Sequence, residues 1–270
     1  AAAHALWNAF LKHKLDPLLG VTLISLGCGI VALPGVLMVG IPHGIGLAFL
    51  AVSLVVHFAY YVALAEAYRH GDLGQIYPIA RGTAPLITAV TAYAVFGERM
   101  SPAGIAGVLA IAGGVLLLSF RGGRAGQSFN RRAAGYGALT ALTIAAYTIV
   151  DAKGGRAGES PWPYIWSLFL GEGILMLAFG MWRWGWTSLV EAVRDNTMTT
   201  FGGGALSTGA YAIAIWAMSV APVGLVAALR ETSVLFAAII GVVLLREPLL
   251  PVRVLAGAIV AIGAMLVRLA

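Results

Sequence analysis

The ionisable residues that lie well inside the long apolar segments of this sequence, away from their ends, are Arg81, Glu172, Arg230, Glu231 and His57. On membrane-insertion scales, a charged side chain at the bilayer centre costs about 2.5–3.5 kcal/mol, so each of these residues needs a structural or functional explanation. A guanidinium group can bind a carboxylate or a phosphate through two parallel hydrogen bonds. The two arginines therefore either bind an anionic ligand or pair with the glutamates and hold helices together.

Proton transfer is the second chemistry that these residues can perform. Carboxyl and imidazole groups inside membrane-spanning helices form the proton relays of pumps and transporters. Glu172, Glu231 and His57 are the candidate coupling residues, and Glu172 is the best of the three because its carboxyl group lies near the middle of an apolar run. For His57 the alternative is a buried neutral imidazole that only makes hydrogen bonds.

Aromatic side chains share helical faces with these charged residues. Tyr77 lies four residues before Arg81, and Tyr61 lies four residues after His57, so each pair occupies one face of a helix. An aromatic face can hold a cationic amine, although packing or anchoring at the membrane interface is the alternative for each aromatic residue. The predicted substrate-binding set is Arg81, Tyr77, Arg230, Tyr61, Tyr211, Trp166 and Trp7. The sequence predicts no catalytic residues, no metal site and no cofactor.

The composition is that of a membrane protein. Of the 270 residues, 60% are hydrophobic and only 10% are charged, and the mean hydropathy is +0.91. A soluble domain is about a quarter charged, so soluble enzymes and nucleic-acid-binding proteins are excluded. The net charge of +6 fits basic loops on the cytoplasmic side of a membrane rather than a nucleic-acid partner. No serine-nucleophile or zinc-protease motif is present, so an intramembrane enzyme is not expected.

Apolar runs of helical length divide the chain. About 20 apolar residues cross a ~30 Å hydrocarbon core, so the chain has room for about ten crossings. A first run ends near Lys12, and the others are expected at 18–39, 44–68, 73–96, 102–120, 133–150, 161–184, 200–220, 223–245 and 250–269. A polar surface segment is expected at 187–199. Pro78 and Pro85 are expected to bend the fourth run beside Arg81.

An internal repeat relates the two halves of the chain. Tyr61 aligns with Tyr211 at a shift of 150 residues. After a one-residue gap, Arg81 aligns with Arg230, Thr83 with Thr232, and Glu98 with Glu247. Five helices per half is an odd number, which predicts two halves of opposite orientation in the membrane. Such inverted repeats build secondary transporters, whose substrate site lies near the midplane where the repeats meet.

The segment from Gly71 to Gly82 resembles the fourth-helix motif of EamA-type transporters in the drug/metabolite transporter superfamily. The segments 5–9, 97–102 and 221–232 resemble the same family, so the similarity extends over essentially the whole chain. It implies an all-α polytopic protein of about ten helices in two inverted five-helix repeats, 1–124 and 132–270, with a central cavity and alternating access. It also implies the multi-pass membrane location of a bacterial inner-membrane protein.

The resulting hypothesis is a secondary transporter that exports a small metabolite, such as an amino acid or a related organic anion or zwitterion. The partners expected are this substrate, the lipid bilayer and a coupling proton, with no nucleic acid. Two alternatives remain open, an exporter of lipophilic cations or drugs and a lipid flippase. The Lys and Arg count in alternate loops favours termini outside the cell, whereas many members of the family have both inside.

Overall fold

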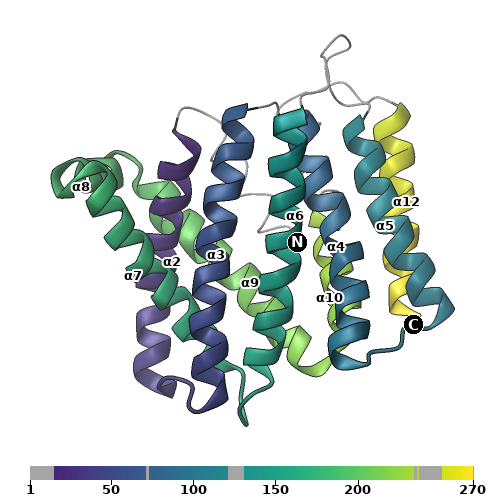
Figure 1. The fold of residues 1–270 in the computed structure, drawn as a ribbon, viewed down its shortest axis with the longest axis horizontal. Helices are drawn as coiled ribbons and strands as arrows, with labels where there is room; N and C mark the ends of the chain where they lie inside the picture. Colours follow the sequence, from purple (N-terminus) through teal and green to yellow (C-terminus); the bar gives the residue numbers. More distant parts are fainter. Residues whose placement is uncertain (1–14, 71–72, 121–130, 234–235, 237–250, 270) are drawn as a thin grey trace. The chain divides into compact units, whose positions relative to one another are not determined.

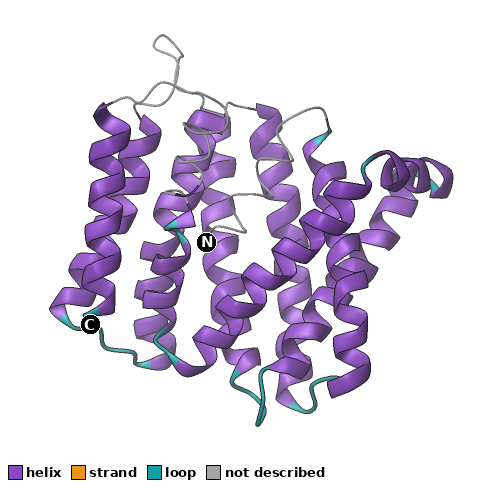
Figure 2. Ribbon diagram, turned by 180° about the vertical axis from the view of Figure 1, so that it is seen from behind, coloured by secondary structure: helices purple, strands orange, loops and turns teal. Residues whose placement is uncertain are grey.

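The computed structural model describes residues 15–70, 73–120, 131–233, 236 and 251–269. Every regular element in these ranges is a helix (Figures 1 and 2). The elements are α2 (Pro17–Val39), α3 (Ile45–His70), α4 (Leu73–Phe96), α5 (Pro102–Phe120), α6 (Arg131–Gly155), α7 (Trp162–Trp184), α8 (Trp186–Asp195), a π-helical turn (Met198–Gly202), α9 (Gly203–Val220), α10 (Val223–Arg230) and α12 (Pro251–Arg268). The all-α prediction is confirmed.

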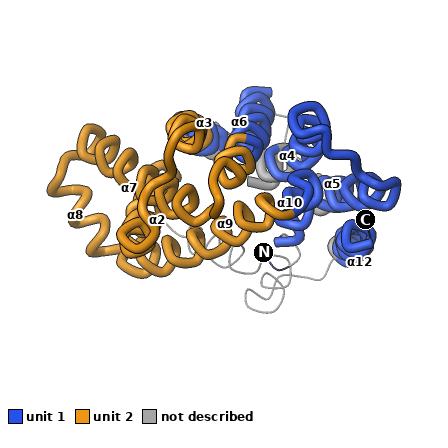
Figure 3. The backbone as a smooth tube through the Cα atoms, turned by 90° about the horizontal axis from the view of Figure 1, so that it is seen from below, with its two compact units in different colours: residues 1–2, 62–149, 221–270 blue, residues 3–61, 150–220 orange. Residues whose placement is uncertain are grey.

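Two compact units make up the chain, and neither is one half of the sequence (Figure 3). Unit 1 contains residues 62–149 and 221–270, and unit 2 contains residues 3–61 and 150–220. The boundaries between the units fall inside α3 and inside α6. The predicted repeats 1–124 and 132–270 therefore do not coincide with the compact units, and their homology stays a prediction.

Capping residues explain where two of the helices begin. Asp16 precedes Pro17, and its carboxylate accepts hydrogen bonds from the amides of Leu18 and Leu19 at 2.9 and 3.2 Å. At the start of α10, the amide of Val223 donates to Oε2 of Glu98 at 2.7 Å. A carboxylate at this end also complements the positive end of the helix dipole. Glu98, which the repeat alignment singled out, thus ties the α4–α5 turn to α10.

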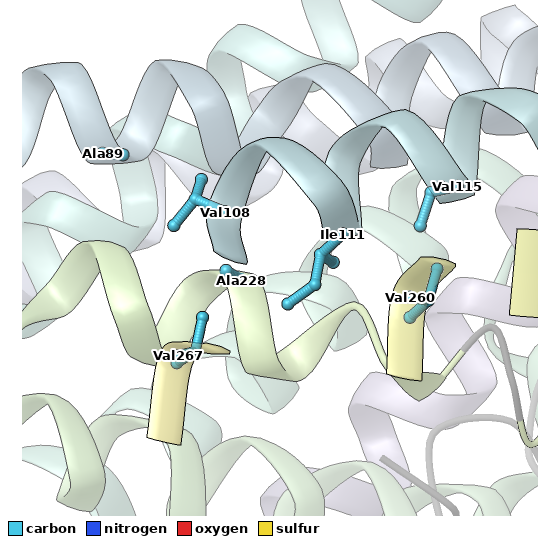
Figure 4. Close-up of a cluster of buried hydrophobic side chains, with 7 residues drawn as sticks. All are labelled: Ala89, Val108, Ile111, Val115, Ala228, Val260 and Val267. Atoms are coloured by element: carbon cyan, nitrogen blue, oxygen red, sulfur yellow. The ribbon is translucent and has the colours of Figure 1, made fainter. Parts of the chain in front are cut away.

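A cluster of buried aliphatic side chains forms the apolar core of unit 1. It contains Ala89 of α4, Ala228 of α10, residues 108, 111 and 115 of α5, and residues 260 and 267 of α12 (Figure 4). Glycines let α5 and α12 approach closely: a Cβ atom added at Gly263 would lie 2.8 Å from the carbonyl oxygen of Gly107. Such small-residue contacts are typical of helix pairs in membranes, where lipid removes much of the hydrophobic driving force.

Unit 2 is also packed through glycines. A Cβ atom added at Gly204 of α9 would lie 2.5 Å from the carbonyl carbon of Gly27 of α2. A Cβ atom added at Gly173 of α7 would lie 2.8 Å from the Cα atom of Gly29. The backbones of α7 and α9 therefore touch α2 directly, and the glycines at the start of α9 serve close packing.

Several helices differ from their predicted limits. α6 continues to Gly155, five residues beyond the predicted end, so the glycines at 154 and 155 are part of the helix. The segment 187–199 is largely the helix α8 rather than an irregular segment. The prediction of an unbroken helix over 223–245 is wrong, since α10 ends at Arg230 and a turn follows at Glu231 and Thr232. The remainder of that predicted run lies outside the described residues.

Four described segments are both long and apolar enough to cross a membrane: Pro17–Val39, Ile45–Ala67, Trp162–Trp184 and Met198–Val220. α4 and α6 have 24 and 25 residues, so each is about 36 Å long or slightly more at 1.5 Å per residue. Their length suits a crossing, but they carry the ionisable side chains Arg81 and Asp151. These two helices position the polar groups of the candidate site.

Candidate functional site: two buried polar clusters

An arginine–glutamate cluster lies in unit 1. Arg81 is on α4, and its Nε atom lies 2.9 Å from Oε2 of Glu231. The Nε atom of Arg230 lies 3.8 Å from the other carboxylate oxygen, Oε1. Arg81 also donates to the hydroxyl of Ser233 at 3.4 Å. Glu231 thus lies between two guanidinium groups, as one of the two sequence interpretations expects.

The end of α10 presents this carboxylate. Arg230 is the last residue of the helix, and the amide of Glu231 turns back to the carbonyl of Ala228 at 3.0 Å. Thr232 caps the same end, because its hydroxyl donates to the carbonyl of Leu229 at 2.7 Å. The guanidinium of Arg230 lies 5.9 Å from the ring centre of Tyr147, within range of a cation–π contact. Broken helices of this kind carry the binding sites of many transporters.

The arginine cluster brings charges of both signs together in a largely buried place. Arg81 and Arg230 supply two positive charges, and Glu231 supplies one negative charge. Arg81 is 7% exposed and Glu231 1% exposed, so these charges are removed from solvent. A buried ion pair gains only if the attraction and hydrogen bonds offset the loss of hydration.

A second cluster, in unit 2, is centred on Asp151. Its Oδ1 accepts hydrogen bonds from the hydroxyls of Ser53 at 2.5 Å and Tyr164 at 2.8 Å. Its Oδ2 accepts a hydrogen bond from the hydroxyl of Tyr211 at 2.5 Å. Asp151 is fully buried, so these three donors replace the water that a carboxylate otherwise binds. The donors come from α3, α7 and α9.

Glu172 and His57 complete this acid–histidine cluster. Oε1 of Glu172 lies 3.3 Å from Nε2 of His57, and Oε2 accepts a hydrogen bond from Tyr61 at 3.0 Å. The ring centres of His57 and Tyr211 are 6.0 Å apart in an edge-on arrangement. The side chains of His57 and Glu172 are both buried. The site therefore holds two carboxylates and one imidazole among tyrosine rings.

The predicted site residues divide between the two clusters. Arg81, Arg230 and Glu231 are brought together in unit 1, whereas His57, Tyr61, Glu172 and Tyr211 are brought together in unit 2. Trp166 stacks on Trp162 at 5.9 Å and packs against Gly35, among the residues of unit 2. Trp7 and the side chain of Tyr77 lie outside the described residues. The bend expected from Pro78 and Pro85 does not interrupt α4, which is one helix from Leu73 to Phe96.

Sequence reasoning missed Asp151, Ser53 and Tyr164. The apolar run expected at 133–150 stops one residue before Asp151, so no role was expected for this residue. A signal was available, since an Asp at the end of an apolar run can still lie within the last turns of a helix. Ser53 and Tyr164 carried no signal, because a lone hydroxyl in an apolar helix is common and its partner is 98 or 13 residues away.

A comparison with known protein families shows which family the chain belongs to. The model described as the EamA-like transporter family matches residues 1–120 and again residues 131–269. The chain belongs to the EamA-like transporter family. It is therefore a polytopic membrane protein and a membrane transporter of the drug/metabolite transporter superfamily. The two separate matches correspond closely to the two halves found in the repeat alignment.

Other comparisons of this EamA-like transporter concern its fold. One solved structure, described only as "Crystal structure of protein", is 19% identical in sequence, with a TM-score of 0.76. The similarity covers 99% of this chain and 96% of that one. The EamA-like chain therefore has the same fold as that protein over nearly its full length. Among the curated proteins, none matches it.

Proposed function

We propose that this EamA-like protein is a secondary transporter of the bacterial inner membrane that exports small metabolites bearing a carboxylate. The substrates are an amino acid or a related organic anion or zwitterion, moved by alternating access through a central cavity. The observation that supports the proposal is the positive charge of two guanidinium groups, one buried and one partly exposed, that share the carboxylate of Glu231 at the end of α10. Burial strengthens this charge because water screens it less.

The arginine cluster can exchange one carboxylate for another. Glu231 contacts Arg81 through Nε, and a guanidinium has five N–H donors in a planar fork. A substrate carboxylate can replace Glu231 on one of the two guanidinium groups. Because Glu231 follows the last residue of α10, a small shift of this helix end would alter both ion pairs together.

A second candidate function draws on the acid–histidine cluster. Asp151 and Glu172 offer two carboxylates beside the rings of Tyr61 and Tyr211, which is chemistry that suits a cationic amine. An exporter of lipophilic cations would use this cluster as its substrate site. A lipid flippase would instead use the arginine cluster on the phosphate of a headgroup.

A thermal-shift screen of the detergent-purified protein separates these candidates. A ligand that binds only the folded state at 100 times its Kd stabilises the protein by about 2.7 kcal/mol. We expect carboxylate-bearing metabolites to raise the melting temperature. Stabilisation only by lipophilic cations would overturn the proposal in favour of a drug-type exporter, and stabilisation only by phospholipid headgroups would favour a flippase.

The first prediction concerns Arg81→Lys. Lysine keeps the positive charge opposite Glu231 but loses the forked geometry, so the variant is expected to fold and to bind the carboxylate ligand about 10- to 100-fold more weakly. The measurement is the ligand concentration that gives a half-maximal thermal shift. Arg194→Lys, at an exposed position on α8, is the matched control and should bind normally. Equal affinity in both variants would remove Arg81 from the substrate site.

A double variant guards against misfolding. Loss of Arg81 alone weakens the charge balance around the buried carboxylate of Glu231, and breaking a buried ion pair costs about 3–5 kcal/mol. Arg81→Gln combined with Glu231→Gln removes both charges of the pair and is expected to keep the fold. Strong carboxylate binding by this double variant would also contradict the proposal.

A further inference from the structure

The protons around His57 can be counted, because each donor has a fixed number of hydrogens. The hydroxyl of Ser53 has one hydrogen, which it donates to Oδ1 of Asp151. Ser53 Oγ therefore has no hydrogen left for Nδ1 of His57, which lies 3.1 Å away. The second neighbour of Nδ1 is the carbonyl oxygen of Ser53, an acceptor, also at 3.1 Å. Both contacts require that Nδ1 carries a hydrogen and donates it.

The opposite ring nitrogen, Nε2, faces carboxylate oxygens. Oε1 of Glu172 lies 3.3 Å away and Oδ2 of Asp151 lies 3.9 Å away. With the ring hydrogen on Nδ1, a neutral imidazole would direct the lone pair of Nε2 at an ionised oxygen, which is repulsive in a buried site. One added proton between Nε2 and Oε1 converts this repulsion into a hydrogen bond, whichever of the two atoms carries it.

The carboxylates of Asp151 and Glu172 differ in the hydrogen bonds that they already accept. Asp151 already accepts hydrogen bonds from three hydroxyl groups, so its ionised form is satisfied without an added proton. Glu172 accepts the hydroxyl of Tyr61 on one oxygen and meets His57 with the other. Asp151 is therefore the fixed negative charge of the cluster, and the variable proton belongs to the contact between His57 and Glu172.

We propose that His57 and Glu172 share one exchangeable proton and form the proton-binding site of this transporter. Release of the proton leaves a neutral imidazole and a carboxylate, so the charge of the cluster changes from −1 to −2 and no electrons move. The groups that face the pair are Ser53 and Tyr61 on α3, Asp151 on α6, Tyr164 on α7, Tyr211 on α9 and the thiol of Cys28 on α2.

The site itself does not depend on the identity of the substrate, and only its role in coupling rests on the proposed function. In an exporter, a proton taken up from the outside and released into the cytoplasm would accompany each substrate molecule that leaves. Tyr61 and Tyr211 are the partly exposed members of the network, and Tyr61 is bonded directly to Oε2 of Glu172. The mixed nitrogen and oxygen contacts suit a proton better than a hard metal cation, which prefers oxygen ligands alone.

Nitrogen-15 NMR of histidine-labelled protein tests the site directly. The His57 signals are assigned by elimination, with Gln placed in turn at the four other histidines, at positions 4, 13, 43 and 70. In the wild type we expect a protonated Nδ1 and an Nε2 that contacts a proton. In Glu172→Gln we expect Nε2 to become an unprotonated acceptor, whereas Glu191→Gln, at an exposed position, should change nothing. An unprotonated Nε2 in the wild type overturns the proposal, even if Glu172→Gln does not fold.

A transport measurement tests the coupling. In proteoliposomes, a pH gradient should drive accumulation of the carboxylate substrate by the wild type and by Glu191→Gln. Glu172→Gln should still exchange labelled for unlabelled substrate but should lose the stimulation by the gradient. Gradient-driven accumulation that persists in Glu172→Gln, or that follows sodium instead, would overturn the coupling role. If no carboxylate substrate moves in any variant, the proposed function fails while the NMR result still decides the proton site.

Discussion

At the scale of single residues, the two clusters solve the cost of buried charge in different ways. Asp151 is stabilised by three neutral hydroxyl donors, whereas Glu231 is stabilised by two charged guanidinium groups. Hydroxyl donors satisfy a carboxylate but leave its negative charge in place, whereas guanidinium groups pair it with positive charge. We therefore expect the acid–histidine cluster to bind cations and protons, and the arginine cluster to bind anions.

The hydroxyl donors of Asp151 give a stability prediction. In Asp151→Asn, an amide NH₂ replaces one acceptor oxygen, so at least one of the hydroxyls of Ser53, Tyr164 and Tyr211 loses its partner or must rotate. We expect the variant to lose about 1–3 kcal/mol of stability. The measurement is unfolding of the purified protein in detergent. The control is Asp195→Asn at the exposed end of α8, and equal melting of the two variants would show that the hydroxyl network does not stabilise the fold.

Sequence reasoning found charged residues more readily than their partners. Arg81, Glu172, Arg230 and Glu231 stand out because each interrupts an apolar run, and all four prove to lie in the polar clusters. Their partners depend on which helices meet, and that depends on packing over separations of more than 100 residues. A single sequence without packing information therefore placed Arg81 and Tyr211 in one site, although they contact different groups.

At the scale of helices, the backbone of α2 directly contacts those of α7 and α9, so the glycines at these contacts have no room for a larger side chain. Gly204→Ala would place a Cβ atom 2.5 Å from the backbone of Gly27, which neither helix can absorb without a shift. Overpacking of this kind typically costs about 1–3 kcal/mol. We expect a lower melting temperature and less folded protein in the membrane.

Gly209→Ala on the same helix is the matched control. No atom lies within 4 Å of the added Cβ, so the substitution only gains helix propensity, about 0.8–1 kcal/mol at most. The two glycine-to-alanine substitutions, five residues apart, are therefore expected to change the free energy of unfolding in opposite directions. A Gly204→Ala variant as stable as Gly209→Ala would contradict the close approach of α2 and α9.

The helices themselves were predicted well where hydropathy alone decides them. The spans 18–39 and 161–184 agree with α2 and α7 within one residue at each end, because their polar boundaries are clear. The break after Arg230 was not predicted, since no Pro or Gly marks it and the signal was expected from Pro78 and Pro85 in α4 instead. At the end of α10, backbone and side-chain hydrogen bonds from Glu231 and Thr232 cap the last carbonyl groups and end the helix.

At the scale of the whole molecule, two kinds of organisation overlap. The family model matches twice along the chain, once in each half, while the compact units combine segments from both halves. Arg81 comes from the first half and Arg230 from the second, so the arginine cluster unites two positions that the repeat alignment pairs. The repeat was detectable from sequence because rare charged residues recur in it. The combination of segments from both halves in each compact unit was not detectable in this way.

The most direct test of the account is substrate flux through the arginine cluster. Purified protein in proteoliposomes would be tested for exchange of labelled amino acids and organic anions, with the wild type, Arg81→Lys and Arg194→Lys compared at equal insertion. We predict rapid exchange by the wild type and by Arg194→Lys, and at least a tenfold loss in Arg81→Lys. Undiminished flux in Arg81→Lys, or flux of lipophilic cations alone, would contradict it.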